Sequence, residues 1–458
     1  MYITLLFDAE DLVDPRSDDA TLRIAQIFAE EGAPSTFMVV GEKARLWEQR
    51  DRRDIVAALQ PHDIGLHTNR HSIHPTVAEY LEGKSWDRGI EEVLAQERPG
   101  VQDLLRIFGR MPSCWGRGGS TWGPQVAPAL RLMNVPAMMY SFTHLGEPRH
   151  RLHYFCGVLS YYWDFGGFDA AFSDDQAFEA AWSEAVEHIG QCVLDGVEWL
   201  GLFVCHPTTV RATVFWDRLN FYQCVNTPPE QWRLPEYRSD AEWEVAQRNL
   251  RRLASQVGRI PGVTIRTVHA VNQLATKPPT MVPVDELARM AQAAALSQEI
   301  ESENPLLSPA EALYLWALWL ESSGEGCALP YHYVEGPSEE PMAQGEAASI
   351  SAESLRCAAR TVLRAVDSNG RLPANVRLGQ AELGIGTIYR ALAAACAGKH
   401  EGDIQLLPGP QVPAVGDILR QEVMEGVPGW MHKPDLDVSQ IATYTRLQSW
   451  TLKPAVLS

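Results

Sequence analysis

The chain has 458 residues, more than a single hydrophobic core usually serves, so we expect one large and one small domain. Its 39 basic and 58 acidic side chains give a net charge of -19, which disfavours nucleic acids and anionic membrane surfaces as partners. The eight cysteines include no CxxC pair and no regular spacing, so we expect reduced thiols rather than a disulfide framework.

The N-terminal segment predicts a first strand and not an export signal, because no basic leader precedes an apolar stretch. Apolar runs everywhere stay below the roughly 18 to 20 residues that a membrane-spanning helix needs. We therefore expect a cytoplasmic protein without a membrane partner.

Short apolar runs alternate with amphipathic stretches up to about residue 275, a pattern typical of parallel strands linked by helices. The expected strands are 2–7, 35–40, 63–67, 113–117, 137–140, 154–161, 200–205 and 263–268. The expected helices are 19–31, 89–108, 125–132, 175–193 and 240–256. This pattern predicts an α/β fold, a (β/α) barrel of seven or eight strands, with its chemistry at the C-terminal strand ends.

The pattern changes after a Pro-rich linker at 276–280, where helical patterns replace strand-like runs. We expect domains at 1–275 and 281–458, the second smaller and all-helical. A loose repeat of about 70 residues, starting at Pro283 and again at Ser351, suggests two helix-loop-helix copies, although chance similarity between amphipathic helices also accounts for it. Capping of the barrel or oligomer contacts are the expected roles, and a homo-oligomer is one of the expected forms.

The strongest local motif is His67-Thr68-Asn69-Arg70-His71, which follows a predicted strand. Two imidazoles four residues apart at a strand end can converge on one metal ion. The first strand ends in Asp8-Ala9-Glu10-Asp11, which supplies the acidic ligand that such a site lacks.

Together these segments resemble the polysaccharide deacetylases that share the NodB-homology fold, also called family 4 carbohydrate esterases. The acidic strand end and His67-Thr68-x-x-His71 resemble the first two motifs of the family. Trp115-Gly116-Arg117 resembles its Arg-centred motif, and His206-Pro207 after an apolar strand resembles its late histidine. The order and approximate separation of the motifs agree with the family as well.

The resemblance implies a barrel that hydrolyses an acyl amide or ester with a divalent metal, zinc first among the candidates. It implies that Asp8 is the general base, with Glu10, His67 and His71 as metal ligands. The remaining catalytic roles fall to three residues: His206 as the acid that protonates the leaving group, Arg117 orienting Asp8, and Asp164 holding His206.

Several alternatives stay open. The family has adjacent acids where this chain has Asp8-Ala9-Glu10-Asp11, so Asp11 is the alternative to Glu10 as the ligand. Two histidines four apart also occur as ordinary surface residues, and strand-end carboxylates also serve as helix caps. We interpret His62 and His74, which flank the motif, as surface or supporting residues.

The leading functional hypothesis is removal of an acyl group, acetyl first, from an N-acyl amino sugar or related carbohydrate. Aromatic side chains near the motifs are compatible with stacking on sugar rings, although core packing explains most aromatics. The residues concerned are Trp115, Trp122, Tyr161, Tyr162, Trp163, Trp216, Phe221 and Tyr222. The alternatives are hydrolysis of a small or cyclic amide, as in allantoinase-like relatives, and a non-catalytic binding or scaffold protein with a degenerate site.

Overall fold

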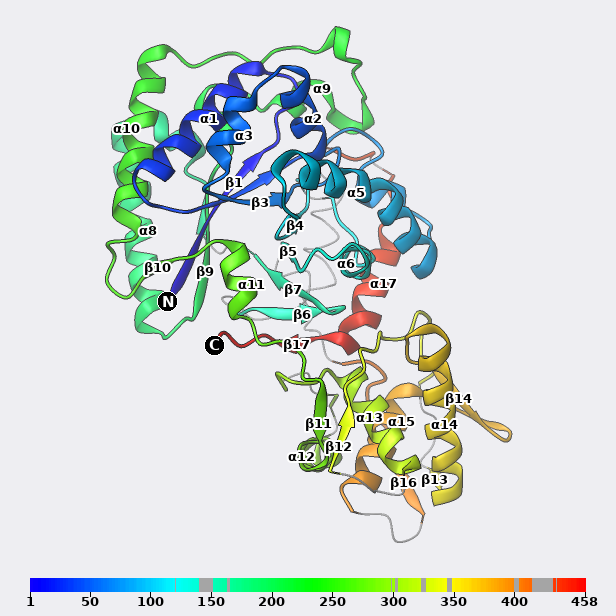
Figure 1. Cartoon of the computed structure of the whole chain (residues 1–458). Helices are drawn as coiled ribbons and strands as arrows, with labels where there is room; N and C mark the ends of the chain where they lie inside the picture. The colour runs from blue at the N-terminus through cyan, green and yellow to red at the C-terminus, as the bar shows by residue number, and fades with distance from the viewer. Residues whose placement is uncertain are drawn as a thin grey trace.

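The computed structural model describes residues 1–458 except 120, 140–150, 163–164, 298, 301–303, 323–326, 344–347, 399–402, 414–430 and 434. The chain forms a large α/β part, blue to green in Figure 1, and a smaller part that is mainly yellow to orange. Over the described ranges, every helix is too short or too polar to cross a bilayer.

A curled, mainly parallel sheet lies at the centre of the large part, and its described strands number 11. Its order is β17-β6-β7-β5-β4-β3-β2-β1-β9-β8, with β10 paired to β1. The bounds are β1 (Tyr2–Ala9), β2 (Thr36–Val39), β3 (Asp63–Leu66), β4 (Trp115–Gly116), β5 (Ala137–Met139), β6 (His153–Phe155), β7 (Val158–Tyr161), β8 (Phe165–Gly166), β9 (Trp199–Cys205), β10 (Thr264–Ile265) and β17 (Lys453–Pro454). Of these, β1 and β9 are almost entirely buried, as expected for strands covered on both faces.

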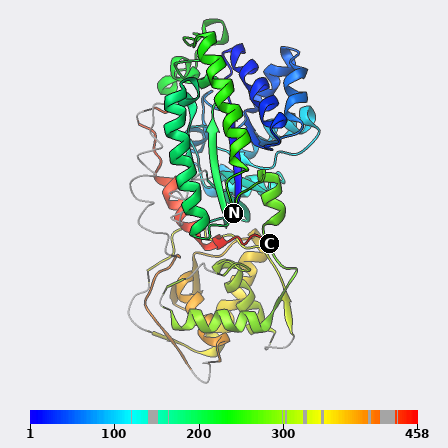
Figure 2. The same ribbon diagram turned by 90° about the vertical axis from the view of Figure 1, so that its left-hand side faces the viewer.

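Helices cover the sheet on its outer side. They are α1 (Pro15–Glu30), α2 (Gly41–Gln49), α3 (Arg53–Leu59), α4 (Val77–Leu81), α5 (Trp86–Phe108), α6 (Val126–Leu132), α8 (Asp175–Leu194), α9 (Trp216–Asn220), α10 (Asp240–Val257) and α11 (Val268–Leu274). Short 3-10 helices are η1 (Asp169–Ser173), η2 (Pro207–Val210), η3 (Tyr222–Cys224) and η4 (Pro229–Gln231). Figure 2 shows α8 and α10 side by side in front of β9, and the two chain ends close together.

The predicted fold class, an α/β barrel with a smaller helical part, is confirmed, although the described sheet is a deformed barrel of 11 strands where seven or eight were expected. One predicted strand is different: 154–161 forms an antiparallel hairpin of β6 and β7 instead of a single strand. The turn consists of Cys156 and Gly157, whose φ angles are 47° and 75°. Two-residue hairpin turns of this type require positive φ angles at both residues and usually contain Asn-Gly or Gly-Gly. Because a cysteine stands at the first position here, the sequence does not indicate the turn.

The smaller part packs α12 (Val284–Leu296) on α15 (Ile385–Cys396), and α13 (Pro309–Glu321) on α14 (Ala352–Asn369). Its own core includes the buried Trp316. Three two-stranded antiparallel sheets add to the helices and correct the expected all-helical region to a mainly helical one. They pair β11 (Met281–Pro283) with β12 (Ala328–Pro330), β13 (Ala348–Ile350) with β16 (Ile404–Leu406), and β14 (Asn375–Leu378) with β15 (Ala381–Gly384).

The two expected repeat copies have different structures at the segments that resemble each other in sequence. In the first copy, Ser308 caps the start of α13 with its side chain. In the second copy, the matching segment from Leu378 to Ile385 is the hairpin of β14 and β15, with a turn at Gly379. A glycine with φ of 61° favours this turn over a helix start.

The end of the chain returns to the large part. After α17 (Ser439–Gln448) and η6 (Ser449–Thr451), β17 pairs antiparallel with β6. Leu447 and Leu452 are buried in the barrel core. The predicted boundary of 281–458 therefore does not hold to the last residue, because this segment completes the edge of the sheet (Figure 1).

Candidate active site

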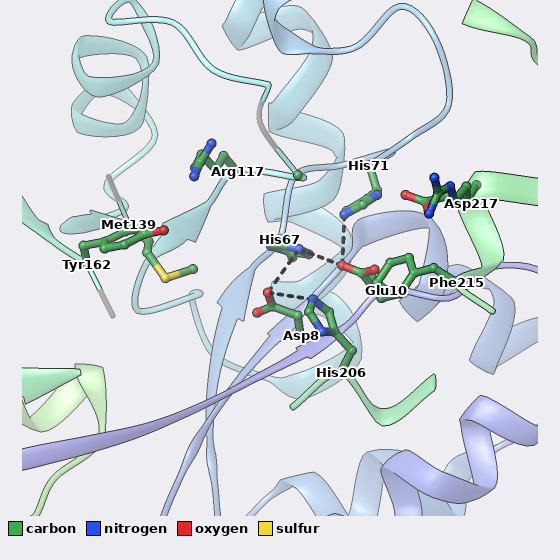
Figure 3. A pocket seen from close by; sticks show the side chains of 12 residues that line it. Asp8, Glu10, His67, His71, Arg117, Met139, Tyr162, His206, Phe215 and Asp217 are labelled. Carbon is green, nitrogen blue, oxygen red and sulfur yellow. Dashed lines mark hydrogen bonds and ion pairs between the residues drawn. The ribbon is translucent and has the colours of Figure 1, made fainter. Parts of the chain in front are cut away.

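The C-terminal ends of the parallel strands open onto one cavity of about 330 Å³. Its lining includes residues at or just after five different strands: Asp8 of β1, His67 after β3, Arg117 after β4, Met139 of β5 and His206 after β9. This is the edge at which α/β barrels carry their chemistry. The sequence-predicted site residues therefore meet at one place, with the exceptions described below (Figure 3).

Glu10, His67 and His71 form what we call the pocket cluster. The Oε2 atom of Glu10 lies 3.1 Å from Nε2 of His67 and 3.0 Å from Nε2 of His71 (Figure 3). All three side chains are almost completely buried. Both imidazoles thus point one nitrogen at the same carboxylate oxygen.

The loop after β3 has a conformation that brings His71 back toward His67. Thr68 and His71 have φ angles of 57° and 49°, and the hydroxyl of Thr68 accepts a hydrogen bond of 2.9 Å from the backbone N–H of His71. Gly118, after β4, packs against the imidazole of His71. A Cβ at position 118 would lie 2.8 Å from Cδ2 of His71, so this close approach requires glycine.

Neighbouring side chains orient the pocket cluster. The indole of Trp216 donates a 3.1 Å hydrogen bond to Oε1 of Glu10. The hydroxyl of Ser72 donates to Asp217 at 2.7 Å and lies 2.7 Å from Nδ1 of His71. Because a hydroxyl has one hydrogen, which Ser72 donates to Asp217, its oxygen accepts a hydrogen bond from the Nδ1–H of His71, and the lone pair of the neutral imidazole is then on Nε2.

The pocket cluster fits a divalent metal. Nε2 of His71 is buried without a hydrogen bond although it lies 3.0 Å from the Glu10 carboxylate. One ligand atom from each of Glu10, His67 and His71 lies within 4.8 Å of the others. Two imidazole nitrogens and a carboxylate oxygen form a common ligand set for a catalytic zinc, and a buried unpaired nitrogen has an explanation if it faces a cation.

Asp11, the alternative ligand, is occupied elsewhere. Its Oδ1 accepts hydrogen bonds from the backbone N–H groups of Val13 and Asp14, and its Oδ2 accepts from the hydroxyl of Thr208 at 2.7 Å. Both carboxylate oxygens therefore close the loop that leads into α1. The geometry favours Glu10 over Asp11 as the ligand.

Asp8 and His206 lie on the other side of the pocket cluster. Oδ2 of Asp8 is 3.6 Å from Nε2 of His67 and 3.8 Å from Nε2 of His206, while its Oδ1 is buried without a hydrogen bond. Burial raises the pKa of Asp8 above its usual value, although the nearby imidazoles of His67 and His206 act in the opposite direction. A carboxylate with an unpaired oxygen beside the pocket cluster is suited to accept a proton.

The carboxylate of Asp169 orients His206. It lies 3.2 Å from Nδ1 of His206 and accepts the backbone N–H of the same residue at 2.9 Å. Burial lowers the pKa of His206, but the carboxylates of Glu10, Asp169 and Asp8 together raise it to about 10. The residue that we predicted for this role, Asp164, lies outside the described residues.

Arg117 lines the cavity but does not have the predicted contact. Over the described ranges, its guanidinium makes no hydrogen bond or ion pair, with Asp8 or with any other residue. The predicted orientation of Asp8 by Arg117 is therefore wrong for this structure. The short β4 ends at Gly116, one residue earlier, and Figure 3 shows the Arg117 side chain directed away from Asp8.

Glu97 is a supporting residue that the sequence analysis missed. Its Oε2 accepts hydrogen bonds from the backbone N–H of Asn69 at 3.0 Å and from the indole of Trp115 at 2.9 Å. Burial raises the pKa of Glu97 to about 7. Its signal was available, because a glutamate stands among the buried apolar positions of α5 between Val93 and Val101.

Of the eight aromatic residues expected near the site, Tyr162 lines the cavity, together with Phe215, which was not predicted. Trp216 is fully buried and serves Glu10 instead. Trp163 lies outside the described residues. The remaining five that we expected do not line the cavity in the part of the chain that the structure describes: Trp115, Trp122, Tyr161, Phe221 and Tyr222.

No family model matches the chain, and no curated protein matches it. Among solved structures, it is similar to a T48 deacetylase solved with substrate, at 16% identity and a TM-score of 0.31 over 58% of this chain and 87% of that chain. It is also similar to the peptidoglycan deacetylase PdaC from Bacillus subtilis, at 13% identity and a TM-score of 0.27 over 58% and 87%. A third is Puue allantoinase, at 13% identity and a TM-score of 0.32 over 45% and 77%. Such loose superpositions carry no argument, so the function has to be inferred from the residues of the pocket.

Proposed function

We propose that the chain is a metal-dependent hydrolase that removes an acyl group, acetyl first, from an N-acyl amino sugar or a related carbohydrate. The observation that carries this proposal is the meeting of two carboxylates and three imidazoles in one cavity at the ends of parallel strands. The residues are Asp8, Glu10, His67, His71 and His206. They combine a metal-ligand set with separate proton-accepting and proton-donating groups, which amide hydrolysis needs.

In this proposal Glu10, His67 and His71 hold a divalent metal, for which zinc is the first candidate. When bound, the metal would polarise the acyl carbonyl and lower the pKa of a water molecule. Trp216 and Ser72 hold the carboxylate and one imidazole in position, as partners of metal ligands commonly do.

The proton transfers fall to Asp8 and His206. Asp8 takes a proton from the attacking water through its free oxygen, while the water oxygen bonds to the acyl carbon. His206, held by Asp169, gives its proton to the amine nitrogen as the carbon–nitrogen bond breaks. The products are a carboxylic acid and a free amine, so the reaction consumes one water and needs no other reagent.

The cavity itself suits a small acylated compound. Its volume of about 330 Å³ is at the small end of ligand pockets, and Tyr162 and Phe215 supply aromatic surface. The side chains of Arg117 and Arg218 also line it, and neither has a polar partner in the described part of the chain. Their guanidinium groups are free to bind oxygen-rich groups of the substrate.

The first test measures acetate release by the full chain from N-acetylglucosamine oligosaccharides, with added zinc and after chelation. We expect release that depends on the metal and returns when zinc is restored. Metal-dependent opening of a cyclic amide without acetate release would support the allantoinase-like alternative. Absence of turnover on both substrate classes would leave the non-catalytic binding protein as the better explanation.

The second test is Asp8→Asn. We expect the turnover number to fall about 10²- to 10⁴-fold, because a general base contributes about this much, while the zinc content stays unchanged. Elemental analysis of the same sample measures the zinc. Unchanged turnover would show that Asp8 is not the base.

A further inference from the structure

A second group of metal-binding side chains lies beside the loop that carries His71. We call it the loop cluster, and it consists of His74, Glu79, Cys224 and His432. These residues come from three segments far apart in the sequence: the loop before α4 and its first turn, η3, and the segment that follows residue 430. We interpreted His74 as a surface or supporting residue, but its side chain is only 7% exposed.

Glu79 is at the centre of the loop cluster. Its Oε2 lies 2.7 Å from Nδ1 of His74, and its Oε1 lies 2.9 Å from Sγ of Cys224 and 3.9 Å from Nδ1 of His432. Ligand atoms bound tetrahedrally to zinc at about 2.0 to 2.3 Å lie about 3.3 to 3.8 Å from one another. One ligand atom from each of His74, Glu79 and Cys224 lies within 4.8 Å of the others, and His432, 3.9 Å from the same carboxylate, is the candidate fourth ligand.

His74 is oriented as a ligand. Nε2 of His74 lies 3.1 Å from the backbone carbonyl of Phe221, so it can donate its proton there and leave Nδ1 toward Glu79. Metal-binding histidines typically donate their second N–H to such an acceptor. The His432 side chain is completely buried, and its Nδ1 lies 3.1 Å from the hydroxyl of Thr76 and 3.9 Å from Oε1 of Glu79, so a metal ligand role requires Nδ1 to exchange the hydroxyl for the ion.

A purely structural role explains only half of the Glu79 carboxylate. Oε2 accepts a 2.7 Å hydrogen bond from the backbone N–H of Thr76, which completes the capping box of α4. Oε1 takes no part in that cap; it accepts a 2.9 Å hydrogen bond from the Cys224 thiol and lies 3.9 Å from Nδ1 of His432. A helix cap does not require a cysteine and a second histidine to gather around the remaining oxygen.

We infer that His74, Glu79, Cys224 and His432 form a second divalent-metal site, closed by four protein ligands and with a ligand set suited to zinc. Thiolate and imidazole ligands select zinc over magnesium or calcium, and four protein ligands are typical of structural zinc. This inference does not depend on the proposed hydrolase activity.

The site would stabilise the contact between the segment around His432 and two other segments near the pocket, those that carry His74 and Cys224. The backbone N–H of Cys224 donates to the carbonyl of Met431 at 3.4 Å, and Met431 lies against Gly119, which lines the cavity. The side chain of Asn226 bonds both backbone groups of His74 at 2.8 Å. A metal here would hold together the loop that carries His71 and the segment that carries Trp216.

Cobalt binding to the metal-free full chain tests the site. Co²⁺ bound to a thiolate gives a charge-transfer absorption in the near ultraviolet, whereas Co²⁺ bound only by imidazoles and carboxylates does not. Since no cysteine is among the described residues that line the cavity, a cobalt ion in the pocket cluster cannot produce this band. We expect the band to grow until about one Co²⁺ per chain has bound to the loop cluster and to disappear when Zn²⁺ is added.

Variants assign the band to its residues. Cys224→Ser should abolish it, whereas Cys357→Ser, which changes an exposed cysteine on α14, should leave it intact. His432→Gln keeps the thiol and should weaken Co²⁺ binding at least about tenfold. Circular dichroism checks that each variant is folded. If Cys224→Ser does not fold, the result for His432→Gln decides the test.

A native chain without the band, or a band that persists in folded Cys224→Ser, would overturn the inference. Unchanged cobalt affinity in His432→Gln would also overturn the four-ligand site. Glu10→Gln separates this site from the proposed function, because it should remove metal from the pocket cluster and leave the band unchanged. A failed hydrolase proposal and a failed second site therefore give different results.

Discussion

The pocket cluster and the loop cluster contain similar side chains, but different parts of the fold hold them. Glu10 and His67 follow directly after β1 and β3, the two parallel strands that flank β2, so the register of the sheet places them at the same edge. In the loop cluster, Cys224 at the end of η3 and His432 come from segments far apart in the chain, which a backbone hydrogen bond from Cys224 to Met431 joins. The sheet therefore positions Glu10 and His67, whereas the loop cluster depends on contacts between segments that are far apart in the sequence.

This difference separates what each cluster can do. Side chains at strand ends are positioned more precisely than side chains on loops, which favours catalysis. A site that joins loops to a distant segment gains its stability from the metal, which favours a fastening role. Residues that support the pocket cluster should therefore affect activity, and they should leave the loop cluster unchanged.

The largest expected effect comes from Asp169→Asn, which removes the carboxylate that holds His206. We expect the turnover number to fall about 10²- to 10⁴-fold. Because Asp169 helps to raise the pKa of His206, its loss lowers that pKa. A general acid must be protonated, so the alkaline limb of the activity profile should move to lower pH. An unshifted limb would show that Asp169 does not act through His206, and the cobalt–thiolate band should be the same as in the native chain.

Glu97→Gln tests how strongly α5 supports the loop between His67 and His71. Burial raises the pKa of Glu97 from 4.5 to about 7, so the folded state binds a proton more tightly than the unfolded state. The contribution of Glu97 to the free energy of unfolding, about 3 kcal/mol, is fully present below pH 4.5. It is lost as the pH rises from 4.5 to about 7.

The Glu97→Gln variant resembles the protonated side chain and should lack this decrease in unfolding free energy. Urea unfolding at several pH values between 4.5 and 7.5 measures the difference. Glu91→Gln is the control, because Glu91 is exposed on the same helix. Equal pH dependence in the native chain and in Glu97→Gln would contradict the raised pKa.

The smallest expected effect is that of Ser72→Ala, which breaks the hydrogen-bonded chain from His71 to Asp217. We expect zinc affinity in the pocket cluster to fall about 10- to 100-fold, the usual cost of losing such a partner. Competition with a chelator measures it, with Ser368→Ala on the exposed face of α14 as the control. If Ser72→Ala weakened the loop cluster equally, the two sites would not be independent.

The predictable part of the candidate site is the part that follows strands. Asp8, Glu10, His67 and His206 were found from acidic or imidazole side chains after apolar runs, and the structure brings them together. Asp169 was missed because η1 has no apolar periodicity that marks it as the start of an element. Arg117 was placed in the cavity correctly, but its contact with Asp8 depends on side-chain direction, which a motif does not specify.

The fold shows the same division. Alternation of buried strands and amphipathic helices was sufficient for the α/β class and for most of the central strands, because burial periodicity is a local property. The hairpin of β6 and β7, the three small sheets after residue 280 and the return of β17 to β6 were not predicted. Each depends on a turn conformation or on a partner far away in the chain.

The sequence by itself determined that strand ends would carry carboxylates and imidazoles, since residue type and the end of an apolar run can both be read locally. Only the tertiary structure decided which carboxylate faces the histidines, because Glu10 and Asp11 are adjacent in the sequence but their side chains point in different directions. Only the tertiary structure brought Cys224 and His432 to Glu79, because contacts between distant loops leave no periodic pattern in the chain.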